Sequence, residues 1–290
     1  MIASNSSLQR EEYLKKKRNR KLLRWVGAFF GLIFIIGGAS YISHRPSIRI
    51  SDVLLSGQVL VAEAEIKSET LSYLHGSYLW LFPKNNAFIY PRNDLIKNLK
   101  NEFKRIDTVN VHLKNFHTLA IDVTERKPVA LWCDTLPGQD IPPVGQGTAH
   151  AGEPEHCYFM DGNSTIFAEA PQFSGDAYFK YYGTVFSEDP IGSYYISSST
   201  KFLGMIDFVE TARKLAIQPL YIVAKNAGEF SLVLHGGGQI YFDTKEPLSK
   251  IVSNLEALLR TPALKISLGQ DLSIDYIDLR FGNKLFYKLK

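Results

Sequence analysis

The stretch DVTERKPVALW, residues 122–132, decides how this chain is divided. Residues 119–123, which run into the start of this stretch, alternate apolar side chains with polar or small ones, as in a strand with one buried face. A charged triplet, residues 125–127, is followed by Pro128, which cannot donate a ladder hydrogen bond and does not suit the interior of a sheet. Apolar residues resume at 129–132. The pattern predicts a joint between two folded units rather than one broken strand.

The N-terminal side of this joint has the pattern of a small unit with the order β-α-α-β-β. Two helices over a three-stranded sheet can bury one small core. The expected elements are a strand at 48–55, a helix at 62–75, a loop or short edge element at 77–90, a second helix beginning at Pro91, and strands around 109–113 and 119–123 with a turn at 114–117.

The C-terminal side is expected to be richer in strands. Turn signals at 161–163, 236–238 and 282–283 predict consecutive hairpins, and therefore a mostly antiparallel sheet with two helices on one face. The whole chain is predicted to be α+β. Helices are expected at 199–216 and 247–260, and strands at 129–133, 156–160, 164–168, 178–186, 219–224, 229–235, 238–243, 274–281 and 284–289.

Positive charge is concentrated at the N-terminus. Residues 1–24 contain eight basic and two acidic side chains, a net charge of +6, which leaves −2 for the rest of a chain whose formal charge is +4. The nearly neutral remainder lacks the clustered cations that nucleic-acid binding requires. We therefore expect a basic tail at 1–24 and no nucleic-acid partner.

Residues 25–43 form an uncharged run long enough to cross a bilayer as a helix. The cations on its N-terminal side place the tail in the cytoplasm and the C-terminus outside. The alternative is a cleaved signal peptide, for which Gly38-Ala39-Ser40 offers small residues. Gly27 and Gly31 have the spacing that lets membrane helices pack closely, although one such match is weak evidence.

Cys133 and Cys157 are the two cysteines, and both lie on the expected outer side of the membrane. An oxidising compartment favours a disulfide between them, which would join two strands at the root of a Pro/Gly-rich loop. Two separate buried thiols are the alternative.

The sequence contains little that indicates catalysis or a cofactor. The glycines at 236–238 lack the spacing of a phosphate-binding loop, and no hydrolase or metalloprotease motif is present. We predict a protein that is not an enzyme and that binds no cofactor or metal. A polar loop is the preferred interpretation of one group that could be drawn as metal ligands, namely His150, Glu153, Glu155, His156 and Cys157.

Two motifs, ERKPVALW at 125–132 and YIDLRF at 276–281, together with the order of the segments, resemble the FtsQ/DivIB family of bacterial cell division proteins. The resemblance covers nearly the whole chain and implies a POTRA-like domain at 44–127 followed by a β domain at 128–290. It implies a membrane-anchored division scaffold at the septum. The chain departs from the family pattern in the aromatic segment 77–90 and in the insert 134–156.

The C-terminal hairpin is the predicted partner-binding surface. Its last strand has one sequence neighbour, so it should lie at a sheet edge, where a partner segment can add a strand. The resemblance implies that small coiled-coil subunits of the FtsB/FtsL type bind here, unless the insert covers the edge. The predicted contact residues are Tyr276, Arg280, Phe281, Asn283, Lys284, Leu285, Phe286, Tyr287 and Lys288.

A second hypothesis is an envelope glycan-binding protein or enzyme that stacks sugar rings on the aromatic segments 77–90 and 178–195. Its candidate residues are Tyr178, Phe179, Tyr181, Tyr182, Tyr194 and Tyr195. Packing within the sheet is the other explanation of these aromatic side chains, because strands are enriched in them.

Overall fold

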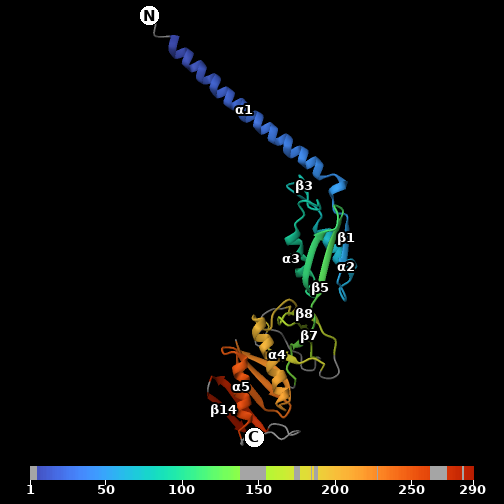
Figure 1. Ribbon diagram of the computed structural model, residues 1–290, viewed down its shortest axis with the longest axis vertical. Helices are drawn as coiled ribbons and strands as arrows, with labels where there is room; N and C mark the ends of the chain where they lie inside the picture. Colours follow the sequence, from blue (N-terminus) through green and yellow to red (C-terminus); the bar gives the residue numbers. More distant parts are fainter. Residues whose placement is uncertain are drawn as a thin grey trace. The chain divides into compact units, whose positions relative to one another are not determined.

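A computed structural model gives the fold of the chain (Figure 1). The chain forms two compact units, Met1–Glu125 and Arg126–Lys290, so the boundary lies inside the 122–132 stretch. The structure describes residues 5–137, 155–172, 177–183, 185, 189–226, 228–261, 273–282 and 284–290.

The first unit begins with a single long helix, α1 (Asn5–Ser43). Its segment Lys16–Ser43 is long and apolar enough to cross a membrane, a property that membrane anchors and signal sequences share. Large apolar side chains on it are exposed, Phe34 to 83% and Trp25 to 76%. No other part of the described chain approaches the Cβ positions of Gly27 and Gly31, so their helix-packing role stays a prediction.

The rest of this unit has a three-stranded sheet in the order β1-β5-β4, with β1 parallel to β5 and β5 antiparallel to β4. A short hairpin, β2 (Ser77–Tyr78) and β3 (Phe82–Pro83), lies between the two helices in sequence. Side chains of both helices are buried with those of the sheet in one core. The larger elements are β1 (Asp52–Ser56), α2 (Glu63–Tyr73), α3 (Arg92–Glu102), β4 (Ile106–Leu113) and β5 (Thr118–Glu125).

The first strand is shorter than expected at its start. A 3₁₀ turn occupies Pro46–Ile48, so β1 begins only at Asp52. Pro46 stands at the start of that turn, where its fixed φ is favourable and its missing N–H costs nothing. The apolar alternation at 48–50 therefore belongs to a connection that buries Ile50 rather than to the strand.

The charged residues of the opening stretch bind on opposite sides of the boundary. One carboxylate oxygen of Glu125 accepts hydrogen bonds from the N–H groups of Val59, Leu60 and Val61, at 2.7, 2.8 and 3.0 Å. These bonds hold the segment that leads into α2. Arg126 forms a largely buried ion pair with Asp161 of the second unit. Adjacent residues are thus tied to different units, which explains why the charged triplet marks the joint.

The second unit is built on one nine-stranded sheet with the order β14-β13-β12-β11-β10-β9-β6-β7-β8. Its helices, α4 (Ser199–Lys214) and α5 (Leu248–Leu259), lie side by side against it (Figure 1). The strands are β6 (Ala130–Cys133), β7 (Cys157–Met160), β8 (Ile166–Glu169), β9 (Lys180–Tyr182), β10 (Pro219–Asn226), β11 (Glu229–Leu234), β12 (Gln239–Asp243), β13 (Ile274–Phe281) and β14 (Lys284–Leu289).

Five of the eight strand pairs in this sheet are antiparallel, and three are parallel. The sheet is therefore mostly antiparallel, as expected, and the strands on either side of each predicted turn pair antiparallel. The three parallel pairs were not expected. Helix α4 connects β9 to β10 and helix α5 connects β12 to β13, and a helical crossover is the usual way to join parallel neighbours. The third parallel pair arises because β9 lies beside β6 rather than beside β8. The strand expected at 178–186 is shortened to three residues.

The large sheet buries side chains on both faces. Under α4 and α5 the core includes Phe202, Phe208, Ile240, Leu255 and Ile277, all with no exposed area. On the other face, Leu131, Cys133, Tyr182 and Val223 form a smaller cluster. The two cysteines are joined in a disulfide between directly opposed residues of β6 and β7, which confirms the predicted pairing. Residues 138–154 of the insert lie outside the described residues.

Candidate partner-binding surface

The two last strands form a hairpin whose alternation assigns its side chains to two faces. Ile277 and Leu279 of β13 are buried in the core beneath the helices. Ile274 is also in this core, because the regular alternation is interrupted by an irregularity in the pairing with β14 between Ile274 and Tyr276. Tyr276, Asp278 and Arg280 stand on the opposite face, because side chains two residues apart share one face of a strand. Gly282 has φ of +66° in the turn, and the side chain of Asn254 on α5 donates a 2.9 Å hydrogen bond to its carbonyl oxygen. Asn283 lies outside the described residues.

Strand β14 is at the edge of the sheet, as predicted from the sequence order. Among the described strands it pairs with β13 alone, so one row of its backbone N–H and C=O groups has no strand partner there. Its apolar side chains are exposed, Phe286 to 51%, Leu289 to 46% and Tyr287 to 40%, and Phe281 at the end of β13 to 56%. Phe281 and Phe286 meet edge to face with ring centroids 5.4 Å apart. Leu285 packs partly on the core and does not share this exposure.

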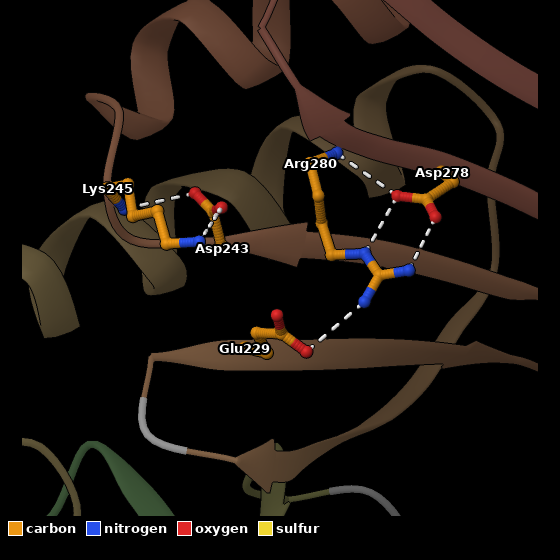
Figure 2. Close-up of polar contacts among 5 residues, drawn as sticks. All are labelled: Glu229, Asp243, Lys245, Asp278 and Arg280. Atoms are coloured by element: carbon orange, nitrogen blue, oxygen red, sulfur yellow. Dashed lines mark hydrogen bonds and ion pairs between the residues drawn. The ribbon is translucent and has the colours of Figure 1, made fainter.

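Arg280 is held in a network that spans three strands, shown in Figure 2. Its Nε and one terminal nitrogen donate to the two carboxylate oxygens of Asp278, at 2.9 and 2.6 Å. The other terminal nitrogen reaches across β12 to Glu229 on β11, at 3.2 Å. On the way the guanidinium lies 5.4 Å from the ring centroid of Tyr241 on β12. The guanidinium of Arg280 is therefore held in place by hydrogen bonds, and two carboxylates already balance its positive charge. It is not an unpaired cation that could bind an acidic partner.

The electrostatics of the pair agree with this geometry. Burial alone would raise the pKa of Asp278, but the hydrogen bonds and positive charge of Arg280 outweigh burial and lower it. The hydrogen bonds to Asp278 likewise raise the pKa of Arg280. Both shifts favour the charged form of each group at neutral pH.

The edge lysines differ from one another. Lys288 forms a 2.8 Å ion pair with Asp275, which raises its pKa, and Lys290 donates to the carbonyl oxygen of Gly236. Lys284 is exposed and has no ion-pair partner among the residues that the structure describes. Of the predicted contact residues, Lys284 is thus the cation that is left for a partner.

The sequence indicated part of this surface. It predicted the hairpin and its edge position, and Asp278 and Arg280 are two residues apart on a strand, a spacing that places both on one face. Glu229 and Tyr241 were missed, because only the order β13-β12-β11 brings them beneath Arg280.

Most of the candidate aromatic residues of segment 178–195 are packed, whereas in segment 77–90 Trp80 is 91% exposed and Phe88 is 68% exposed. Tyr181 and Tyr182 are each 1% exposed, and burial raises the pKa of both hydroxyls. The hydroxyl of Tyr195 donates to the carbonyl oxygen of Tyr182 at 3.1 Å. Tyr194 is 59% exposed, and Tyr178 and Phe179 line a cleft of about 830 Å³. Packing within the sheet therefore accounts for Tyr181, which does not line this cleft. Tyr182 is among the residues that line the cleft, but only 1% of it is exposed there.

Two of the five residues that could be drawn as metal ligands, Glu155 and Cys157, have other partners in the structure. Both cysteine sulfurs are joined in the disulfide, so neither is a thiolate. Glu155 accepts a hydrogen bond from the hydroxyl of Tyr182 and forms a 2.7 Å ion pair with Lys180. His150 and Glu153 lie outside the described residues.

In comparisons with known proteins, no family model and no curated protein matches this chain.

Proposed function

We propose that this protein is a non-enzymatic, membrane-anchored scaffold of the bacterial cell division machinery, of the FtsQ/DivIB type that its two sequence motifs resemble. In this proposal α1 crosses the cytoplasmic membrane once at the division septum, with its basic end in the cytoplasm and the C-terminus outside. The outer units hold other division proteins and thereby link septal wall synthesis to division.

The exposed edge strand β14 carries this proposal. Unpaired backbone groups together with exposed apolar side chains invite addition of a partner strand, with backbone hydrogen bonds giving affinity and side-chain contacts giving register. The rigid Arg280 network supports the strand next to the edge. We propose that small membrane-spanning coiled-coil subunits of the FtsB/FtsL type add such a strand, and that Lys284 meets an acidic side chain of the partner.

Proline substitutions along β14 test the proposal. Successive N–H groups of a strand point in opposite directions, so of Phe286→Pro and Tyr287→Pro one removes a donor to β13 and the other removes an outward donor. We expect the outward substitution to abolish co-purification of the subunits while the melting temperature of the protein stays nearly unchanged. Phe286→Ala and Tyr287→Ala are the matched controls, because each removes the ring and keeps the backbone donor.

Undiminished recovery of the subunits with both proline variants would refute the edge as the binding site. A fluorescent fusion imaged in growing cells tests the wider role. The proposal expects signal gathered at the division site, whereas uniform signal around the cell throughout the cycle would contradict it. Pull-down by cross-linked peptidoglycan without membrane proteins would favour the glycan hypothesis instead.

A further inference from the structure

The hairpin β2–β3 ends in a tip of unusual composition. Leu79 and Trp80 both have positive φ, 47° and 60°, in a turn closed by a 2.9 Å hydrogen bond from the N–H of Leu81 to the carbonyl oxygen of Tyr78. Such turns favour glycine and asparagine, because bulky side chains rarely adopt left-handed backbone conformations. Trp80 is nevertheless 91% exposed and Leu79 82% exposed. Within the described chain these two side chains have almost no packing contacts that would explain their presence.

Hydrogen bonds hold this hairpin beside the last turn of α1. The hydroxyl of Ser40 donates to the carbonyl oxygen of Leu81 at 2.7 Å. The side-chain amide of Asn86, which is 3% exposed, donates to both the carbonyl oxygen and the hydroxyl of Ser43, at 3.2 and 2.9 Å. Figure 1 shows β3 next to the C-terminal end of α1. Ser40 and Ser43 belong to the uncharged run 25–43, so the hairpin lies at the level where the apolar helix ends.

The same end of the unit carries a second apolar group. The parallel pairing of β1 with β5 puts the start of β1, which follows α1, beside the β4–β5 turn at 114–117. In that turn Phe116 is 53% exposed, and its ring centroid is 5.3 Å from that of Phe88, which is 68% exposed. Nearby, Arg45 lies over the ring of Tyr41 at 4.8 Å.

This composition is the one found where proteins meet the membrane surface. Tryptophan and tyrosine concentrate at the level of the lipid headgroups on both sides of a membrane. Exposed apolar side chains gathered at one place also mark an interaction site rather than an ordinary surface. If α1 spans the bilayer, the lipid surface lies beside this tip whether or not another protein is present.

We propose that Leu79 and Trp80 insert into the outer headgroup region of the bilayer that α1 crosses. The inference rests on the membrane anchor of the proposed function and goes beyond it. The hairpin, with Phe88 and Phe116 beside it, gives the first unit a second membrane contact in addition to α1. The first unit is thereby held in a fixed orientation on the membrane surface instead of pivoting about the end of the helix.

Tryptophan fluorescence in nanodiscs tests this with the full chain. The protein has three tryptophans, Trp25, Trp80 and Trp132, and Trp132 is buried in the second unit. In the Trp25→Phe protein, lipids brominated just below the headgroups should quench roughly half of the emission, because one of the two remaining tryptophans would lie at the interface. The matched control Trp25→Phe/Trp80→Ser should lose this quenching, and aqueous iodide should not quench Trp80.

The possible outcomes separate the alternatives. Quenching of Trp80 by iodide and not by brominated lipid would overturn the inference, because the tip would then lie in water. Protection of Trp80 from both quenchers would also overturn it, since protein rather than lipid would then cover the tip. In the Trp80→Ser protein, which keeps Trp25 and the buried Trp132, quenching of Trp25 by the same lipids reports on the anchor separately. If Trp25 is not quenched, the proposed anchor itself fails and the inference fails with it.

Discussion

Glu125 is expected to stabilise the first unit through its three backbone hydrogen bonds. The substitution Glu125→Ala removes the shared acceptor of the N–H groups of Val59, Leu60 and Val61. Glu125→Gln keeps an acceptor oxygen of the same geometry but removes its charge. Comparing the two variants separates the hydrogen bonds from the charge that strengthens them.

The magnitude follows from the exposure of the donors. A hydrogen bond to a charged group contributes about 1.5–3 kcal/mol, and the loss is smaller where water can replace the partner. Val59 and Leu60 are 81% and 70% exposed, whereas the N–H of Val61 is in a partly buried setting. We therefore expect Glu125→Ala to lower the free energy of unfolding of the first unit by about 2 kcal/mol, and Glu125→Gln by about half of that.

The pH dependence gives a second signature. Burial alone would raise the pKa of Glu125, but hydrogen bonds from Val61, Val59 and Leu60, together with the charge of Arg105, lower it below its ordinary 4.5. A lowered folded-state pKa stabilises the fold above the unfolded-state pKa, and this stabilisation is lost as the pH falls through the folded-state value. The difference between the parent protein and Glu125→Gln should thus be complete at neutral pH and shrink below about pH 4.5.

Pulse proteolysis in urea measures this effect for each unit, because the surviving fragments report which unit remains folded. Glu102→Gln, at an exposed carboxylate near the end of α3, is the charge-matched control and should change the stability by less than about 0.5 kcal/mol. If Glu125→Ala were no less stable than Glu102→Gln, or if only the second unit lost stability, the role assigned to Glu125 would be wrong.

Three further predictions concern the Arg126–Asp161 ion pair, the disulfide and the membrane helix. Arg126→Leu should destabilise the second unit by about 3 kcal/mol, because Asp161 would keep a buried charge without its cation; pulse proteolysis showing no change would count against this. Thiol labelling of the denatured, unreduced protein should find no free cysteine, and Cys133→Ser/Cys157→Ser should cost on the order of 3 kcal/mol; stoichiometric labelling would rule out the bridge. Protease added to spheroplasts should digest residues 44–290 and leave a short membrane-bound stub, whereas full protection would reverse the orientation and a soluble mature product would indicate a signal peptide.

Local patterns in the sequence predicted most of the elements. The apolar stripe of residues 248–259 and the turn glycine at 282 act within a few residues, so helix α5 and the last hairpin could be expected without a structure. The Pro128 boundary was likewise a local signal, because proline removes a backbone donor wherever it occurs.

Features that depend on distant pairing could not be predicted in this way. The placement of β9 between β6 and β10 makes two parallel pairs and buries Tyr181 and Tyr182. From the sequence, these two residues could equally have been exposed to bind a glycan or packed within the sheet. The contact of Arg280 with Glu229 requires the strand order β13-β12-β11. The hydrogen bond between Ser40 and Leu81 joins residues 41 positions apart, and no local sequence pattern predicts it.

Backbone exchange at β14 tests the central claim most directly. Hydrogen–deuterium exchange of the full-length protein is to be compared with and without the bound division subunits, for peptides that cover residues 284–290. If a partner strand adds to this edge, the outward N–H groups of β14 should exchange much more slowly in the complex, while the exchange of β8 at the opposite edge stays unchanged. A complex that forms without any added protection in β14 would contradict the account.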